Sequence, residues 1–115
     1  MDNEKQYIAY LVELMQTIGP VYAKAMFGGH GIYLHGLMFG LVEKGTLYLK
    51  VDKESELEFK QLGLEAFTYN KKDKVVKLSY FQAPDEAMED SEEMNTWANK
   101  AYSAALRSAA KKKGK

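Results

Sequence analysis

The chain of 115 residues contains no cysteine, and Arg107 is the single arginine among its 16 basic residues. The lack of cysteine excludes a disulfide framework, a thiolate metal site and a cysteine nucleophile. The single arginine argues against sequence-specific reading of DNA by this chain alone, because bidentate recognition of guanine relies largely on arginine.

Long apolar runs and targeting signals are missing as well. The longest apolar stretches fall far short of the ~20 residues that cross a bilayer, and residues 1–5 lack the basic-then-apolar order of a secretory signal. The apolar fraction of 46% and the charged fraction of 28% are typical of a folded globule. We therefore expect a soluble, cytoplasmic protein without a membrane segment, with one domain over residues 1–110 and a flexible lysine-rich tail at 111–115.

The formal net charge of zero conceals an uneven distribution. Residues 1–99 hold all 16 acidic residues and ten lysines, a net charge of −6, whereas residues 100–115 carry +6. Such a basic end can contact an acidic partner, or it can complement a helix dipole and keep the terminus soluble. We favour the second interpretation, because four tail lysines neutralise only a few phosphates.

The order of elements can be predicted from apolar periodicity and turn residues. A first amphipathic helix ends at Gly19-Pro20. Glycines divide residues 21–51 into three or four antiparallel strands, with tight turns at His35-Gly36 and Lys44-Gly45. Asp52 caps a short helix over residues 53–62.

A second hairpin is predicted over residues 66–70 and 74–81, with Asp90 or Ser91 capping a final helix. The final helix is expected to bury a stripe made of Met94, Trp97, Ala98, Ala101, Tyr102, Ala105 and Leu106. The predicted order is thus α-β(3-4)-α-β(2)-α. This order indicates an α+β fold, with a single antiparallel sheet of five to six strands and flanking helices.

Catalytic, metal-binding and cofactor-binding constellations are not evident. His30 and His35 are the only histidines, and their odd spacing places them on opposite faces of a strand. The serines lie in no nucleophile elbow. The glycines of residues 26–33 match neither a dinucleotide fingerprint nor a P-loop, so we interpret them as bulge or turn positions. We expect a protein that is not an enzyme and has no cofactor.

Two lysine groups are the candidate nucleic-acid-binding residues. Lys71, Lys72 and Lys74 surround the predicted second hairpin turn, and Lys111, Lys112 and Lys113 lie near the C-terminus. The 14 aromatic residues are an alternative source of stacking platforms, but strand alternation places Lys77 opposite Tyr80, and we expect the aromatic residues to pack in the core and sheet.

Several ordered blocks of the sequence resemble the N-terminal domain of the TfoX/Sxy family of bacterial competence regulators. The blocks are Met26-Phe27-Gly28-Gly29 with Gly31-Ile32-Tyr33, Met38-Phe39-Gly40-Leu41-Val42, Gly45-Thr46-Leu47-Tyr48-Leu49-Lys50-Val51-Asp52, Gly63-Leu64-Glu65-Ala66-Phe67-Thr68-Tyr69, and Ser79-Tyr80-Phe81-Gln82-Ala83-Pro84. Glycines and core aromatics dominate these blocks, so they identify a fold better than a site.

The resemblance implies a non-enzymatic transcription regulator that acts through protein contacts. It implies a coactivator whose partner is the cyclic-AMP receptor protein or RNA polymerase, and a domain that is often a homodimer. A nucleic-acid-associated module that uses the lysine-rich tail is the alternative. Competence regulators of this family carry a second, helical domain after this one, so the resemblance fits either a stand-alone member or a chain that continues past Lys115.

Overall fold

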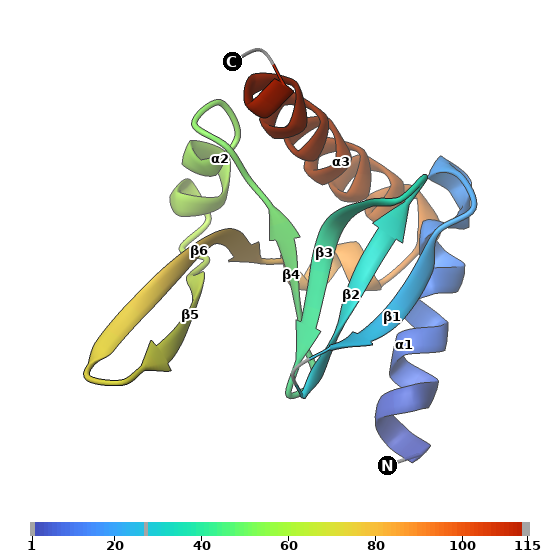
Figure 1. Ribbon diagram of the computed structural model, residues 1–115. Coiled ribbons are helices and arrows are strands. Elements are labelled where there is room, and N and C mark those ends of the chain that lie inside the picture. The colour runs from blue at the N-terminus through green and yellow to red at the C-terminus, as the bar shows by residue number, and fades with distance from the viewer. Residues whose placement is uncertain (1, 27, 114–115) are drawn as a thin grey trace.

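The computed structural model describes residues 2–26 and 28–113, with side chains from residue 4 to residue 112. Figure 1 shows helices on one side of a twisted sheet and a hairpin that projects from its edge. The elements are α1 (Asp2–Met15), the 3-10 helix η1 (Gln16–Ile18), β1 (Tyr22–Met26), β2 (Gly29–Leu34), β3 (Leu37–Glu43), β4 (Thr46–Lys50), α2 (Glu56–Gln61), β5 (Ala66–Lys71), β6 (Lys74–Gln82), the 3-10 helix η2 (Asp85–Met88) and α3 (Ser91–Lys113).

The described strands form one antiparallel sheet in the order β1-β2-β3-β4-β6-β5. This arrangement confirms the predicted α+β fold, with the larger of the two expected strand numbers. Short turns join β1 to β4 in sequence, whereas α2 separates β4 from the β5–β6 hairpin. The hairpin then returns so that β6, and not β5, pairs with β4.

Two hairpin turns lie where the sequence predicts them. His35 and Gly36 have φ values of 52° and 80°, and Lys44 and Gly45 have φ values of 51° and 80°. Positive φ at both central residues is typical of a type I′ turn, whose twist matches that of antiparallel strands. Glycine at the second position relieves the strain that a side chain would add there.

The core lies between the sheet and the two long helices. Leu11 and Met15 of α1 are fully buried, and so are Ala98, Ala101 and Met94 of α3. The small alanine side chains let α3 pack closely on β3 and β4, where Phe39 and Tyr102 meet edge to face at 5.8 Å. At the other end of the core, the ring centroid of Phe59 lies 5.2 Å from that of Trp97 and 6.0 Å from that of Phe81. These aromatic contacts join α2 to α3 and β6.

Two local predictions need correction. The regular helix α2 begins at Glu56 and not at residue 53, although Asp52 makes the bonds of a cap: its Oδ1 atom accepts from the Ser55 N–H, its own N–H donates to Ser55 Oγ, and its carbonyl accepts from the Glu56 N–H. Leu106 was expected in the buried stripe but is 49% exposed, because the last turns of α3 extend beyond the sheet (Figure 1). α3 continues to Lys113, past residue 110 where the sequence places the end of the domain, and the division of the chain at that residue stays a prediction. Residues 114–115 lie outside the described residues.

The cap predicted for the final helix is present. The Asp90 Oδ1 atom accepts a hydrogen bond of 2.8 Å from the backbone N–H of Glu93. This bond satisfies one of the free donors of the first turn of α3. In the described part of the chain, no helix has the length and apolar character needed to cross a membrane.

The glycines of β2 are required by close packing. A Cβ atom at Gly29 would lie 2.4 Å from the backbone oxygen of Val42, whereas a Cβ atom at Gly31 would meet the side chains of Met26, Tyr33 and Met38 at 2.9–3.2 Å. The first obstacle is backbone, but the second includes the flexible ends of two methionines. The structural interpretation of these two glycines therefore has a steric basis.

We predict that Gly29→Ala lowers the free energy of unfolding by roughly 2–3 kcal/mol, whereas Gly31→Ala lowers it by about 1 kcal/mol, because methionine side chains can move and the β3 backbone cannot. Urea denaturation of the two variants and the wild type measures the difference. Equal losses at the two positions would contradict this explanation.

Candidate functional site

Strand alternation leaves one face of the sheet without a helix. Leu47 and Leu49 of β4 point into the core, so the side chains between and after them point to the opposite side. The same reasoning applies to the other strands, and Figure 1 shows α1 and α3 on one side only. We call the other side the open sheet face; its residues on β1–β4 and β6 include Tyr22, Lys24, Gly31, Tyr33, Met38, Leu41, Tyr48, Lys50 and Tyr80.

Register aligns two sets of these residues across the sheet. Tyr22 pairs with Tyr33 and Tyr33 pairs with Met38, whereas Lys50 pairs with Tyr80. The pairs of β3 with β4 run from Gly40 with Leu49 to Glu43 with Thr46 and do not join Met38 to Lys50. A register shift at Ile32/Tyr33 brings Met38 opposite Tyr33. We call these five residues, together with Lys24, the tyrosine–lysine row.

Aromatic and cationic groups are in direct contact along the row. The rings of Tyr22 and Tyr33 are stacked, with centroids 5.5 Å apart and an interplanar angle of 11°. The Lys24 Nζ atom lies 5.1 Å from the Tyr33 ring centroid, and the Lys50 Nζ atom lies 5.3 Å from that of Tyr80. Each lysine is within the range of a cation–π interaction.

Partial burial shifts the pKa values of two residues of the row, Tyr80 and Lys50. Burial raises the pKa of Tyr80 to about 12, and the neighbouring Tyr33 adds to this effect. Burial also lowers the pKa of Lys50; the positive charge of Lys112 lowers it further, whereas Asp52 opposes the shift. Tyr80 therefore remains a neutral hydroxyl, and Lys50 and Lys112 are close enough to repel each other.

An apolar groove of about 660 Å³ occupies the other end of the open sheet face. It is lined by Met26, Gly29, Met38, Leu41, Glu43, Phe67, Tyr69, Lys71 and Leu78. The Phe67 ring packs edge to face on Tyr48 at 5.0 Å. The lining thus has one acidic and one basic side chain on a surface that is otherwise mainly apolar and aromatic.

The lysines predicted to bind nucleic acid lie in two separate places. Lys71, Lys72 and Lys74 are exposed at the tip of the β5–β6 hairpin, and Lys111 and Lys112 are exposed on the last turns of α3. The backbone of Lys113 belongs to α3, but its side chain is outside the described residues. Figure 1 shows the hairpin tip far from the end of α3, so the fold does not bring the two groups together.

Sequence reasoning missed Lys24 and Lys50, which the sheet places beside Tyr33 and Tyr80. The sequence of residues 46–51 does predict which side of the sheet Lys50 faces. Apolar Leu47, Leu49 and Val51 alternate with Tyr48 and Lys50, so Lys50 is expected on the face opposite the core. The neighbours of Lys50 on other strands cannot be predicted without the strand order.

The two histidines lie apart, as their spacing suggested. His35 is exposed in the β2–β3 turn, whereas His30 is at the other end of β2 with its Nδ1 atom 3.7 Å from Glu4 Oε2. Within residues 2–26 and 28–113, no group of three His, Cys, Asp or Glu side chains could hold a metal ion.

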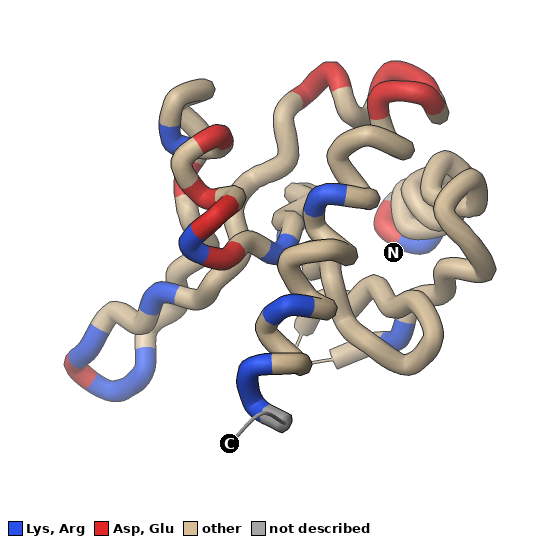
Figure 2. Tube along the Cα trace, turned by 90° about the horizontal axis from the view of Figure 1, so that it is seen from above, with Lys and Arg blue, Asp and Glu red and all other residues tan. Residues whose placement is uncertain are grey.

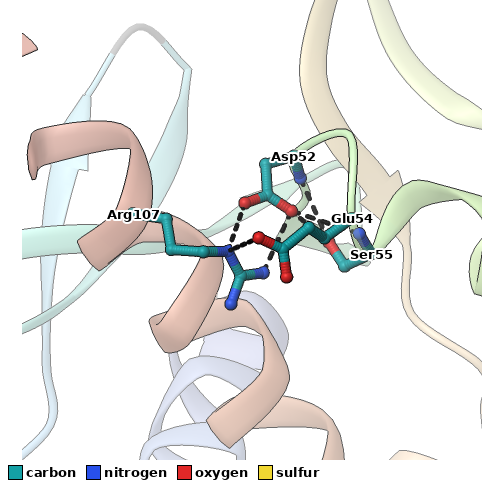
Figure 3. A network of polar contacts seen from close by, with 4 residues as sticks. All are labelled: Asp52, Glu54, Ser55 and Arg107. Carbon is teal, nitrogen blue, oxygen red and sulfur yellow. Dashed lines mark hydrogen bonds and ion pairs between the residues drawn. The ribbon is translucent and has the colours of Figure 1, made fainter. Parts of the chain in front are cut away.

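The single arginine is held in a network of acidic groups (Figure 3). Arg107 Nε donates to Asp52 Oδ2, Arg107 Nη2 donates to Asp52 Oδ1 at 3.0 Å, and Glu54 Oε2 lies 3.4 Å from Nε. The Ser55 N–H and hydroxyl groups both donate to Asp52 Oδ1 at 3.1 Å. These bonds hold the pKa of Asp52 well below its ordinary value, with the hydrogen bond from Arg107 as the largest cause.

This network reduces the free positive charge at the end of the chain. Arg107 is paired with Asp52, and Lys100 forms an ion pair of 3.2 Å with Glu58 of α2. Figure 2 shows acidic residues at the start of α3 and basic residues towards its end. The charge of +6 counted for residues 100–115 is therefore partly neutralised by acidic residues of the body.

Comparison with known proteins identifies the family. The chain matches the TfoX N-terminal domain over residues 13–105, which is most of its length, so it belongs to this family. It is also similar to the DNA transformation protein TfoX1 of Aliivibrio fischeri (strain ATCC 700601 / ES114), with 32% identity over 71 residues. The matched region is 62% of this chain and 34% of that protein, so the chain matches about a third of the relative's length.

We predict that Arg107→Ala lowers the free energy of unfolding by about 1–3 kcal/mol, because it leaves a half-buried carboxylate without its bidentate donor. Lys100→Ala is the matched control, since it breaks an exposed ion pair on the same helix and should cost about 0–1 kcal/mol. Chemical denaturation compares the two variants, and equal losses would contradict the structural role of Arg107.

A pH dependence follows from the lowered pKa of Asp52. A carboxyl group whose pKa is lower in the folded state stabilises the fold above its unfolded pKa of about 4, and this stabilisation is lost as the pH falls below that value. We therefore expect wild type to be more stable than Asp52→Asn near neutral pH and the difference to shrink in acid. Thermal denaturation of both proteins, from neutral pH to below about pH 4, checks the expectation. A difference in stability that stays constant over this range would refute it.

Proposed function

We propose that this member of the TfoX N-terminal domain family is a non-enzymatic regulatory domain that takes part in DNA transformation. The observation that carries the proposal is the similarity to a DNA transformation protein at 32% identity over 71 residues, within a family match over residues 13–105. Identity at this level over most of a domain supports a shared fold and a related role.

The chemistry of the open sheet face supports a binding role over a catalytic one. Its row presents tyrosine hydroxyls, lysines and a methionine, and the titratable residues that line the groove are Glu43, Tyr69 and Lys71. His30 and His35 lie at opposite ends of β2. A nucleophile with an adjacent base, the arrangement that covalent catalysis needs, is not formed by these groups.

The proposed partners are the cyclic-AMP receptor protein or RNA polymerase, contacted through protein surfaces. A second copy of the chain is a further proposed partner, since β1 and β5 are the two edges of the sheet and edge strands can pair with another chain. The large apolar groove beside β5 supports protein contacts in the same region.

Deletion of the gene from its own organism is expected to reduce transformation by added DNA, and the wild-type gene should restore it. Complementation with Arg107→Ala should be weaker because the domain is less stable, whereas Lys100→Ala should behave as wild type. Unchanged transformation after deletion would reject the proposed role.

Co-precipitation from the same cells tests the proposed partners. The tagged wild-type protein should retain the cyclic-AMP receptor protein or RNA polymerase above the level retained by an unrelated tagged protein. Sedimentation of the purified chain tests self-association, and a single species of about 13 kDa at micromolar concentration would count against a homodimer.

A further inference from the structure

We propose that the tyrosine–lysine row of the open sheet face binds single-stranded nucleic acid. Bases would stack on the exposed ring of Tyr22, and on Tyr33 and Tyr80 when Lys24 and Lys50, which lie over those two rings, turn to contact phosphates. This inference goes beyond the proposed regulatory function, and its central residues are ones that the sequence did not suggest, although Lys112 of the second lysine group lies near Lys50.

The row has the arrangement that base stacking on a sheet needs. Its side chains come from β1, β2, β3, β4 and β6, so it spans four inter-strand spacings of about 4.8 Å each. Tyr22 is 41% exposed, and its ring is stacked on that of Tyr33. Aromatic rings on an open sheet surface can stack bases of single strands, because unstacked bases expose their flat faces.

The charges along the row favour phosphate. Lys24 is exposed and Lys50 is half-buried, and each ammonium lies just above a tyrosine ring. Lys112 is near enough to lower the pKa of Lys50 by repulsion, and a bound phosphate would relieve that repulsion. Asp52, the acidic group that acts on Lys50, is itself paired with Arg107. Glu43 lines the groove at the other end of the face.

The same features disfavour a protein occupant for this row. Lysine is depleted from the centres of protein interfaces, and the row carries two lysines but no leucine, isoleucine or valine. Two copies that met through this face would bring Lys24 and Lys50 of both copies into one interface. A polyanion with flat apolar bases complements both the charge and the rings.

Binding by this row would not depend on base sequence. Arg107, the single arginine, is occupied by Asp52, and stacking accepts every base. Two or three lysines would contact phosphates. Each neutralised phosphate is expected to contribute about −0.7 to the slope of log K against the logarithm of the salt concentration, so the total slope should be about −2. The interaction is therefore strongest at low ionic strength.

Fluorescence anisotropy with a labelled oligothymidylate of about 15 nucleotides, in low salt, tests the proposal. Wild type is expected to bind, and Tyr33→Ala and Lys50→Ala should each weaken binding by about five- to tenfold. Tyr33→Phe should retain binding because it keeps the ring. Lys60→Ala is the matched control, since Lys60 is an exposed lysine of α2 that is paired with Glu56.

Three results would overturn the proposal. The first is an absence of binding in low salt by a wild-type protein that circular dichroism shows to be folded. The second is binding that Tyr33→Ala and Lys50→Ala leave unchanged but that truncation after residue 110 abolishes, which would assign binding to the lysine-rich end. The third is a dimer in sedimentation that Tyr22→Ala dissociates while oligonucleotide binding is absent, because the face would then be an interface between copies.

Discussion

The close packing of α3 on β3 and β4 is the interaction on which the rest of the structure depends. Its buried alanines, Ala98, Ala101 and Ala105, let the helix axis approach the sheet, and Met94 and Trp97 fill the space towards η2 and α2. α1 packs beside α3 and completes the same layer (Figure 1). Because both long helices cover one face, the strands direct the fully buried residues such as Ile32, Leu47 and Leu49 to that face, and the alternate residues are left on the other.

This one-sided cover explains the character of the open sheet face. A fully solvated sheet face is usually polar, but here it carries tyrosines, methionines and a groove of about 660 Å³. Gly29 and Gly31 add no side chain to this face. A side chain at Gly29 would collide with the backbone of Val42, and one at Gly31 would collide with the side chains of Met26, Tyr33 and Met38. The residues that look structural in the sequence thus also shape the surface that is available to a partner.

Most of the fold can be predicted from the sequence because its signals are local. Gly19-Pro20 marks the end of the first helical region, His35-Gly36 and Lys44-Gly45 mark hairpin turns, and Asp90 caps the last helix. The failures occur where contacts distant in the sequence compete with local signals. Asp52 caps the turn that leads into α2, as expected, but the regular helix begins only at Glu56, and the carboxylate of Asp52 also binds Arg107, a residue 55 positions away. Leu106 fits the periodicity of the buried stripe, yet the sheet ends before it.

The sequence by itself determined the class of fold, the order of the elements, the family resemblance and the separation of the two histidines, because periodicity, turn residues and spacing act over short distances. Only the tertiary structure decided which side chains meet. Strand order places Lys50 beside Tyr80, and the pairing of β1 with β2 stacks Tyr22 on Tyr33. The path of α3 brings Arg107 to Asp52, which neutralises the one arginine and part of the basic end. Pairings of this kind depend on register and crossing geometry, and those are set by the packing of the whole chain.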